Sequence, residues 1–395
     1  MKKVFLIICD GMADRPIVQL KDKTPLESAV KPNIDKITTR SVTGLMHPVD
    51  VGVRPGSDIA HLSLFGYPID IYYPGRGPFE AAGYGLEIKI GDVALRGNFA
   101  TVDNDLIVLD RRAGRIDDTR GLIAKLSEIS VPGLKLFWAK GNSHRLALVL
   151  RGKNLSGQVT DTDPHETGIR VLKAKPQTGD KNAKRTAGII NFLSDSFHEK
   201  LKYQDKANFV LLRGAGMLPE IPTFESRYGL KAVCITGGGL YQGIGKILGM
   251  EVIKNRKFTG KPNSDISGKI KTGLAALKSY DFIFIHIKAA DNLAEDGNFA
   301  GKKKFIEKID RALHPLVNRD DILLILTSDH TTSSELKRHT ADPVPILLAG
   351  KNLHVDQVNF FGEREVSRGR LGHIKGSHLM PLILDYVGLS KLKGA

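Results

Sequence analysis

The stretch VFLIICDG, residues 4–11, decides the fold. Its apolar residues, Val4 to Cys9, end abruptly at an acidic residue and a glycine, and Phe282 to Ile287 and Ile322 to Leu326 have the same form. Short, almost wholly apolar runs rich in branched residues are typical of parallel strands buried on both faces. Between the last two runs, Phe299 to Val317 repeats apolar residues at helical spacing. The sequence therefore predicts an α/β fold with a doubly wound, mostly parallel sheet.

The length of the chain and a change of pattern in its middle predict two domains. A chain of 395 residues exceeds the size at which one core grows efficiently. Ala94 to Asp110 and Leu134 to Leu150 hold shorter β-like stretches, and the sheet pattern resumes near Leu230 to Ile235. Val344 to Leu348 is a further strand candidate, and Leu379 to Val387 a closing helix. We expect a discontinuous sheet domain over residues 1–80 and 225–395, with a smaller α+β domain inserted over 81–224.

Composition excludes several classes of protein. An apolar fraction of 41% and a charged fraction of 26% are ordinary for a soluble globular protein. The net charge of +15 fits nucleic acid, an anionic surface or a small anionic substrate as a partner, but scattered lysines usually form a solvated face and do not favour nucleic acid. Cys9 and Cys234 give neither a disulfide framework nor a metal motif. The first apolar run is too short for a signal peptide, and no other run could span a membrane, so we expect a cytoplasmic protein.

An acidic residue follows each of three predicted central strands: Asp10, Asp291 and Asp329. Because ligands bind outside the carboxyl ends of strands in open parallel sheets, the three carboxylates could converge. One acid at a strand end is usually a turn residue or a cap, so the inference depends on the set. His330 and His339 add nitrogen donors, and such a mixed set suits Mn²⁺, Zn²⁺ or Mg²⁺. The sequence therefore predicts a divalent metal centre.

Glu295 leaves two interpretations open. It follows Asp291 by four residues, which places both side chains on one face if a helix starts there. Glu295 is then either a further metal ligand or an acid in the first turns of the following helix, where acids favour the helix dipole.

Ser57 is the candidate nucleophile. It follows Pro55-Gly56 and begins an apolar-periodic segment, where a serine is ordinarily an N-cap. The same position offers backbone N–H groups and a helix dipole that stabilise an alkoxide and an incoming phosphate. A nearby metal ion would lower the pKa of the hydroxyl without a histidine base. Together with the predicted metal centre, Ser57 indicates metal-assisted phosphoryl transfer.

The inserted segment carries arginines in two tight groups, Asp110 to Arg115 and Leu212 to Gly216. Guanidinium groups match phosphate and carboxylate bidentately, so these groups favour a substrate that carries both, although a solvated loop would look alike. His144-Arg145 and Thr160 to His165 could orient hydroxyl groups or move a proton, or be ordinary turns.

Several motifs occur in a fixed order along the whole chain and carry a family resemblance. They are Cys9-Asp10-Gly11-Met12, Thr24-Pro25-Leu26-Glu27, Gly56-Ser57-Asp58, Asp110 to Arg115, Arg213-Gly214-Ala215-Gly216, His286 to Asp291, Asp329-His330-Thr331-Thr332 and His339 to Pro345. The chain resembles the archaeal-type, 2,3-bisphosphoglycerate-independent phosphoglycerate mutases of the alkaline-phosphatase superfamily. The resemblance implies an alkaline-phosphatase-like fold.

The resemblance also implies a function. It predicts an isomerase of glycolysis and gluconeogenesis that interconverts 3-phosphoglycerate and 2-phosphoglycerate through a phosphoserine at Ser57, without 2,3-bisphosphoglycerate. It implies two divalent ions, Mn²⁺ first, with Mg²⁺, Co²⁺ and Zn²⁺ as alternatives. The implied catalytic residues are Ser57, Asp110 and His144. The implied metal ligands are Asp10, Ser57, Asp329 and His330 at one ion, and Asp291 and His339 at the other. The implied substrate-binding residues are Arg111, Arg115, Arg145 and Arg213.

One position departs from the family. The family usually has histidine four residues after the aspartate that matches Asp291, and this chain has Glu295 there. If Glu295 binds the metal, its harder, charged oxygen donor should shift the metal preference of the second site from Zn²⁺ toward Mn²⁺ or Mg²⁺.

Two other hypotheses remain open at this stage. A superfamily phosphatase or phosphopentomutase would use the same nucleophile on another substrate. A non-catalytic anion-binding relative would keep the fold without activity, with Glu295 as its sign. For the mutase we expect a small-molecule partner, no nucleic acid and no membrane, and the sequence leaves open whether it is a homo-oligomer.

Overall fold

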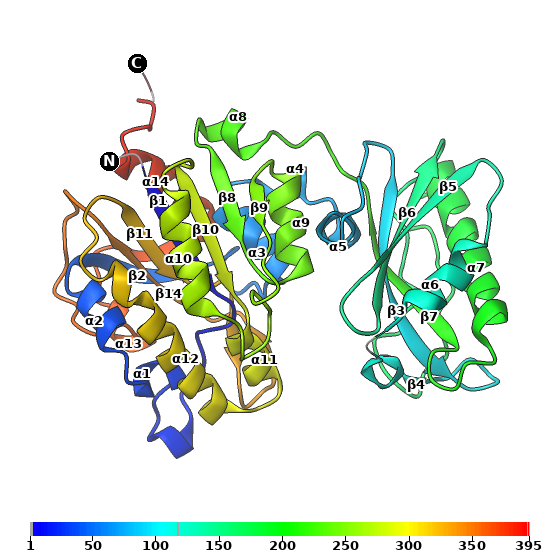
Figure 1. The fold of residues 1–395 in the computed structure, drawn as a ribbon, viewed down its shortest axis with the longest axis horizontal. Helices are drawn as coiled ribbons and strands as arrows, with labels where there is room; N and C mark the ends of the chain where they lie inside the picture. Colours follow the sequence, from blue (N-terminus) through cyan, green and yellow to red (C-terminus); the bar gives the residue numbers. More distant parts are fainter. Residues whose placement is uncertain (1–2, 117, 393, 395) are drawn as a thin grey trace. The chain divides into compact units, whose positions relative to one another are not determined.

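The computed structural model describes residues 3–116, 118–392 and 394. The chain divides into two compact units, one formed by Met1–Ile71 with Pro222–Ala395 and the other by Tyr72–Ile221 (Figure 1). The second unit begins at residue 72, where the sequence suggested 81. The reason is that helix α5 (Arg76–Gly83) packs on strands of the second unit, β3 (Val93–Val102) and β7 (Phe209–Gly216).

The first unit is built on an eight-stranded sheet in the order β15-β2-β14-β11-β1-β10-β8-β9. Only β14 runs antiparallel to its neighbours in this sheet, so the sheet is mostly parallel, as predicted. The strands are β1 (Val4–Cys9), β2 (Ser41–His47), β8 (Ala232–Ile235), β9 (Glu251–Ile253), β10 (Phe282–Ile287), β11 (Leu323–Thr327), β14 (Val344–Ala349) and β15 (Gly372–Lys375). A separate hairpin joins β12 (Thr331–Ser333) to β13 (Arg338–Thr340).

Helices cover both faces of this sheet (Figure 1), because successive side chains of its buried strands point to opposite sides. In β10, Ile285 packs in a cluster with Ile270 and Ile306, whereas the ring of Phe284 meets that of Phe65. The principal helices are α2 (Pro32–Thr38), α3 (Ser57–Leu64), α9 (Gly239–Ile247), α10 (Ile266–Ala276), α11 (Ala289–Glu295), α12 (Phe299–Leu313) and α14 (Leu379–Tyr386). The shorter ones are α1 (Pro25–Ser28), α4 (Ile69–Tyr72), α8 (Phe224–Tyr228) and α13 (Glu363–Val366).

Helix α12 ends earlier than its apolar pattern predicted. It stops at Leu313, and a 3-10 turn follows over His314–Leu316. Proline has no N–H to donate and disfavours helical geometry in the residue before it, so Pro315 explains the early end.

The second unit is an α+β structure. Its five-stranded antiparallel sheet consists of β3, β4 (Val108–Asp110), β5 (Leu134–Lys140), β6 (Arg145–Gly152) and β7. One face packs on α7 (Lys181–Leu201), whose Ile190, Leu193 and Phe197 share a core with the sheet, and on α6 (Arg120–Ser127). Asp180 caps α7 by accepting hydrogen bonds from Asn182 N and Ala183 N.

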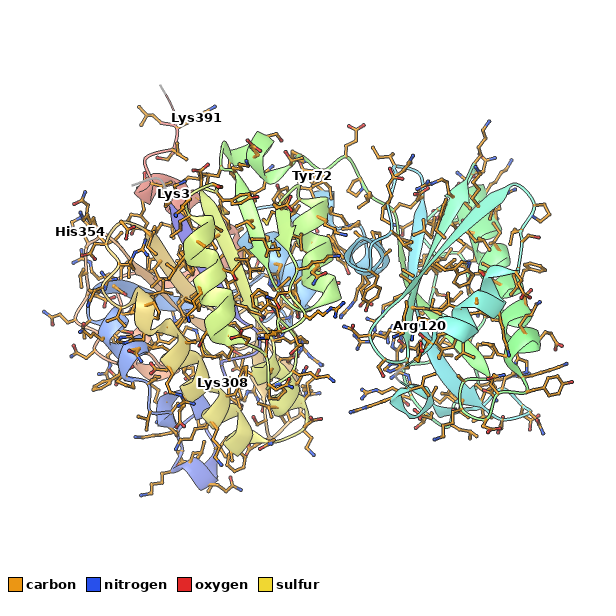
Figure 2. All side chains as sticks on the ribbon, viewed as in Figure 1. Lys3, Tyr72, Arg120, Lys308, His354 and Lys391 are labelled. Atoms are coloured by element: carbon orange, nitrogen blue, oxygen red, sulfur yellow. The ribbon has the colours of Figure 1, made fainter. Side chains whose placement is uncertain are left out.

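The surface agrees with the scattered charge of the sequence. In Figure 2 the labelled Lys3, Lys308 and Lys391 belong to separate segments of the first unit, and Arg120 begins α6 in the second. Among the described residues, we find no helix with the length and apolar character that crossing a bilayer requires.

Candidate metal and phosphoryl-transfer site

Parallel pairing brings the acidic strand ends of the first unit together. Strand β1 lies between β10 and β11, with Cys9 opposite Ile287 and Ile8 opposite Thr327. Asp10 therefore leaves the sheet beside the ends of both neighbours. The backbone N–H of Asp291 donates to Asp10 O at 3.0 Å, so helix α11 begins against the end of β1.

One group of metal-ligating atoms comes from Asp10, Asp329 and His330. Their ligand atoms all lie within 4.8 Å of one another, and all three side chains are fully buried. His330 Nε2 lies 3.2 Å from Asp10 Oδ1 and 3.4 Å from Asp329 Oδ2. Two carboxylates and one imidazole are a donor set suited to a divalent ion.

Ser57 faces this group. Its Oγ lies 3.2 Å from His330 Nε2, and the side chain is buried. Gly56, rather than Ser57, is the N-cap of α3, and Ser57 is the first helical residue. The hydroxyl is therefore directed to the metal-ligating group and not to capping its own helix.

A second group combines Asp291, His330 and His339, again with ligand atoms within 4.8 Å of one another. His339 Nε2 lies 3.4 Å from Asp291 Oδ1, and its ring stacks on that of His330 at 3.6 Å between centroids. Glu295 ends helix α11, is exposed, and does not belong to the groups found among the described residues. Partial loss of hydration, and then the charge of Asp291, raise the pKa of Glu295.

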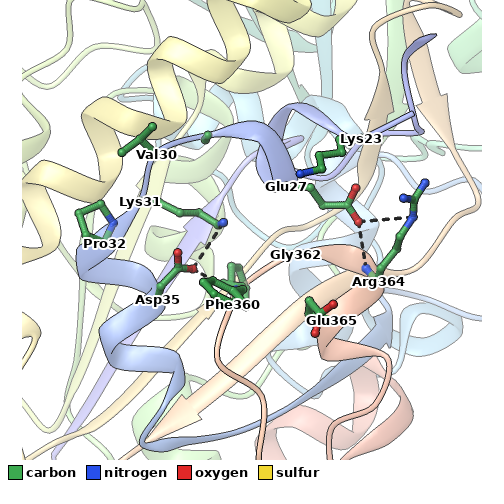
Figure 3. A pocket seen from close by; sticks show the side chains of 12 residues that line it. Lys23, Glu27, Val30, Lys31, Pro32, Asp35, Phe360, Gly362, Arg364 and Glu365 are labelled. Atoms are coloured by element: carbon green, nitrogen blue, oxygen red, sulfur yellow. Dashed lines mark hydrogen bonds and ion pairs between the residues drawn. The ribbon is translucent and has the colours of Figure 1, made fainter. Parts of the chain in front are cut away.

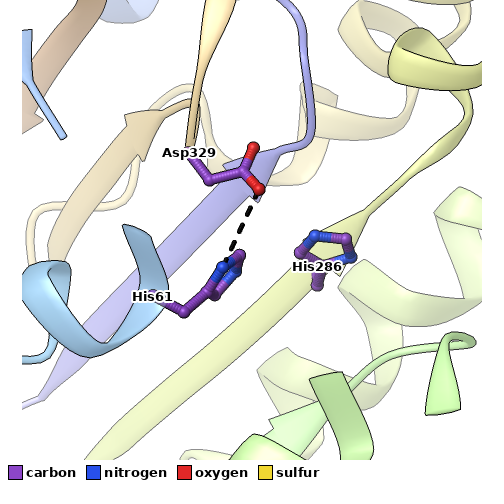
Figure 4. Close-up of side chains that lie close together, drawn as sticks. All are labelled: His61, His286 and Asp329. Carbon is purple, nitrogen blue, oxygen red and sulfur yellow. Dashed lines mark ion pairs between the residues drawn. The ribbon is translucent and has the colours of Figure 1, made fainter. Parts of the chain in front are cut away.

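A third group, His61, His286 and Asp329, was not expected from the sequence (Figure 4). His61 lies one helical turn after Ser57, and its Nδ1–H donates to Ser57 O at 2.6 Å. His286 lies inside the apolar strand β10, where burial lowers its pKa to about 3 against the opposing effect of Asp10. A histidine in an otherwise apolar strand was the available signal, and it was hidden by the strand pattern.

A lysine and a tyrosine side chain donate hydrogen bonds to the carboxylates of Asp10 and Asp291. Lys288 Nζ donates to Asp10 Oδ2 at 3.1 Å and to Asp291 Oδ2 at 2.8 Å, and the hydroxyl of Tyr241 donates to Asp10 Oδ2. Burial alone would raise the pKa of Asp10, but Lys288, His286 and His330 together hold it well below its usual range. Sequence reasoning missed Tyr241 because it follows a glycine-rich turn with no motif of its own.

Buried polar atoms without a hydrogen-bond partner test whether a metal fits here. Among the described residues they include Asp10 Oδ1, Asp329 Oδ2, His61 Nε2 and His286 Nε2. Burial, and next the charge of Asp10, raise the pKa of Asp329. Burial opposes protonation of His330, yet Asp329 and Asp10 raise its pKa to about 9. Since buried charges are normally paired or bound to metal, this donor set fits a divalent cation.

In the second unit, Asp163 gathers two of the predicted arginines. Arg111 donates from Nε to Asp163 Oδ1 at 2.9 Å and from Nη2 to Oδ2 at 2.7 Å, and Arg213 Nη1 donates to Oδ2 at 3.1 Å. The Asp163 side chain is fully buried, so this pairing fixes both guanidinium groups in one place.

A neighbouring stretch of the same sheet carries further charged residues. Arg213 pairs across strands with Arg96, and Arg145 pairs with Asn98. Glu80, also missed from the sequence, accepts from Arg76 Nε at 2.9 Å and lies 3.1 Å from Arg96 Nη1. Burial would raise the pKa of Glu80, but Arg96, Arg76 and Arg145 lower it to about 2.

The remaining predicted residues of this unit have distinct surroundings. His144 is buried, and burial followed by Arg145 lowers its pKa to about 4. Asp110 accepts from Arg112 N at 2.8 Å and from Gly114 N at 2.6 Å, which stabilises its own turn. Arg115 is exposed beyond that turn.

A pocket of about 540 Å³ in the first unit is separate from these residues (Figure 3). Four of its charged side chains form two pairs, with Lys31 Nζ 3.4 Å from Asp35 Oδ1 and Arg364 Nε 3.8 Å from Glu27 Oε1. It shares no residue with the metal-ligating groups, so it is not the candidate site.

Comparisons with known proteins agree with a metal-dependent enzyme. The family model described as Metalloenzyme superfamily matches residues 2–386, so the chain belongs to that superfamily. The 2,3-bisphosphoglycerate-independent phosphoglycerate mutase 1 of Archaeoglobus fulgidus is 44% identical over 410 residues, covering 99% of this chain and 100% of that protein. The chain belongs to the family of 2,3-bisphosphoglycerate-independent phosphoglycerate mutases, which are isomerases.

Solved structures agree with this assignment. The cofactor-independent phosphoglycerate mutase from Thermoplasma acidophilum is 33% identical with a TM-score of 0.72, covering 98% of this chain and 100% of that one. A protein from Pyrococcus horikoshii is 31% identical with a TM-score of 0.86, covering 100% of this chain and 99% of that one. The fold class and family predicted from the sequence are therefore confirmed.

Proposed function

We propose that this chain interconverts 3-phosphoglycerate and 2-phosphoglycerate by passing the phosphoryl group to Ser57 and back. The observation that carries the proposal is the position of Ser57 Oγ, 3.2 Å from His330 Nε2 and beside buried Asp10 and Asp329. A hydroxyl among metal-ligating side chains at the start of a helix suits attack on phosphorus.

The reaction then has two balanced halves. In the first, Ser57 Oγ bonds to phosphorus, the bond between phosphorus and the glycerate oxygen breaks, and the serine proton goes to the departing oxygen. In the second, the other glycerate hydroxyl bonds to phosphorus, the phosphoserine bond breaks, and its proton returns to Ser57. Water could attack the phosphoserine in place of the glycerate hydroxyl and release free phosphate. Physical exclusion of water from the site therefore distinguishes a mutase from a phosphatase.

We assign two divalent ions to the first unit. Asp10, Asp329 and His330 with Ser57 would hold one, and Asp291, His339 and Glu295 the other. Bound there, the ions would supply the charge that lowers the pKa of the serine hydroxyl and stabilises the transferring phosphoryl group. The four carboxylates of this set match the charge of two divalent cations. Mn²⁺ suits the mixture of oxygen and nitrogen donors, and Mg²⁺, Co²⁺ and Zn²⁺ are the alternatives.

The arginines of the second unit would bind the substrate anion. Arg111 and Arg213, held on Asp163, and Arg145 match the phosphate and carboxylate of phosphoglycerate. Arg115 is assigned to the same anion. We assign Asp110 and His144 to the glycerate hydroxyl groups during reorientation.

The test of the overall proposal is product analysis. Incubation of the enzyme with 3-phosphoglycerate and Mn²⁺, followed by phosphorus NMR, should yield 2-phosphoglycerate without 2,3-bisphosphoglycerate. Release of free phosphate instead would assign the chain to a phosphatase.

Replacement of Asp163 by Asn should raise the KM for 3-phosphoglycerate about 10-fold or more, because the two guanidinium groups lose their shared charged acceptor. Steady-state kinetics measure this. Asp195→Asn is the matched control, since Asp195 pairs with Lys173 at 2.6 Å on the exposed surface of the same unit. Equal KM values for the two variants would remove Asp163 from substrate positioning.

Glu295 sets the choice of metal in the second site. Glu295→Ala should weaken binding of one Mn²⁺ equivalent about 10-fold, and Glu295→His should shift preference toward Zn²⁺, because nitrogen replaces a hard oxygen donor. Competition titrations of metal-free protein with Mn²⁺ and Zn²⁺ measure both the Mn²⁺ affinity and the preference between the two metals. Asp296→Asn, one residue further on and exposed, serves as control. Unchanged metal content and activity in Glu295→Ala would exclude Glu295 from the site.

A further inference from the structure

Thr332 lies directly behind two of the proposed metal ligands. Its Oγ donates to Asp291 Oδ1 at 2.8 Å, and His330 Nδ1 lies 3.0 Å from the same oxygen. The side chain is fully buried in the short strand β12. One hydroxyl therefore contacts a residue of each ligand group.

The direction of these hydrogen bonds fixes a tautomer. The Thr332 hydroxyl has a single hydrogen, which it donates to Asp291 Oδ1. His330 Nδ1 must then donate to Thr332 Oγ. In the neutral ring this leaves the lone pair on Nε2, the atom that faces Asp10 and Ser57.

A buried ammonium group holds the backbone of Thr332. Lys302 is fully buried, and its Nζ donates to Thr332 O at 2.9 Å, to Ala13 O at 2.9 Å and to Asp14 Oδ2 at 2.8 Å. Thr332 N also donates to Ala13 O at 3.1 Å. Strand β12 is thus joined to the segment that follows Asp10.

Asp14 completes this arrangement. Its carboxylate also accepts from Ser334 N at 3.0 Å and from Ser334 Oγ at 2.6 Å. All three donors of Lys302 are used, and the charge of Lys302 is matched by Asp14 within the core.

Close approach at Gly11 keeps Thr332 near the ligands. A Cβ at Gly11 would lie 2.6 Å from Thr332 Oγ and 2.8 Å from the Cα of Asp291, and the φ angle there is +61°. Only glycine accommodates both the contact and this backbone conformation readily. The segment after Asp10, strand β12 and helix α11 therefore meet at one point.

We propose that Thr332 is a positioning residue for the metal centre, held in place by Lys302 and Asp14. Through one hydroxyl it fixes the Nδ1–H form of His330 and the orientation of the Asp291 carboxylate. Outer hydrogen-bond partners of this kind commonly set the affinity of a metal site. The inference rests on the metal centre of the proposed function.

The test is Mn²⁺ titration of the metal-free protein, followed by electron paramagnetic resonance. Thr332→Val keeps the shape and removes both hydrogen bonds, and it should weaken Mn²⁺ binding about 10-fold to 100-fold. Thr332→Ser restores the hydroxyl and should bind within about threefold of wild type. Thr331→Val is the matched control, because Thr331 Oγ donates to Asp342 O at 3.1 Å and contacts neither ligand.

The Mn²⁺ titration distinguishes failure of the Thr332 proposal from failure of the proposed metal centre. Wild-type affinity in Thr332→Val, or equal weakening in Thr331→Val, would overturn the role of Thr332. Absence of Mn²⁺ binding by the wild-type protein would instead overturn the metal centre itself.

Lys302 needs a charge-balanced variant. Lys302→Met alone leaves buried Asp14 without its cation and risks unfolding, so Lys302→Met with Asp14→Asn is compared with wild type after circular dichroism shows equal folding. We expect this double variant to weaken Mn²⁺ binding about 10-fold. Wild-type affinity in the folded double variant would remove Lys302 and Asp14 from the proposal.

Discussion

Ser57→Ala should lower kcat about 10⁵-fold or more and abolish the phosphoenzyme, because removal of a catalytic nucleophile leaves only residual catalysis by binding and charge. The buried hydroxyl lies 3.2 Å from His330 Nε2, and no other described serine occupies that position. Two measurements check the prediction: a coupled mutase assay, and trapping of radiolabelled phosphoprotein after brief incubation with labelled 3-phosphoglycerate.

Ser63→Ala provides the control for this variant. Ser63 lies in the same helix α3 and is buried, but it stands near the C-terminal end of the helix, whereas Ser57 is its first residue. It should keep both activity and phosphoenzyme. Mutase activity retained by Ser57→Ala would exclude the phosphoserine route. If Ser57→Ala and Ser63→Ala bound 3-phosphoglycerate equally well and the wild-type protein showed no turnover, the results would favour a non-catalytic anion-binding protein.

The sheet of the first unit could be predicted because burial on both faces leaves a direct mark on sequence. Strands such as Val4–Cys9 and Phe282–Ile287 are almost wholly apolar, and their ends point to the acids that follow. His286 shows the limit of that pattern, because a polar residue inside a buried strand is explained only by what it faces, here Asp10 at 3.3 Å. That partner is 276 residues away in sequence and is brought close by strand pairing.

The second unit was harder to predict for a related reason. The arginine groups were visible, but Glu80 was not, and Asp163 was noted only as part of Thr160 to His165 and not as their acceptor, since a lone acid in a turn or helix is usually a surface residue. Arg111 and Asp163 are joined across a sequence separation of 52 residues. Motifs identify the groups that bind a ligand, whereas only the folded chain identifies the buried charges that hold them.

The proposed metal centre holds buried charges that water does not screen. Asp10 and Asp329 are both fully buried, and each has an oxygen with no hydrogen-bond partner among the described residues. Burial and the charge of Asp10 raise the pKa of Asp329, so keeping Asp329 ionised near neutral pH opposes folding of the metal-free protein. A bound divalent cation would offset that repulsion. Metal binding at the proposed centre would therefore be linked to stability as well as to activity.

Removal of divalent metal should consequently abolish mutase activity and lower the melting temperature. At a free Mn²⁺ concentration of about 1,000 times Kd, binding stabilises the folded state by about 4 kcal/mol, which corresponds to roughly 10 °C for a domain of this size. Calorimetry of the enzyme with Mn²⁺ and after chelation measures the shift. Asp329→Asn should change the melting temperature of the metal-free protein in the opposite direction. Without the buried charge, the metal-free variant should melt above metal-free wild type. Mn²⁺ should then raise its melting temperature only slightly. Full activity and an unchanged melting temperature of the wild-type enzyme after chelation would contradict the metal-dependent mechanism. Loss of the Mn²⁺-dependent melting shift in Asp329→Asn would assign the stabilisation to this centre.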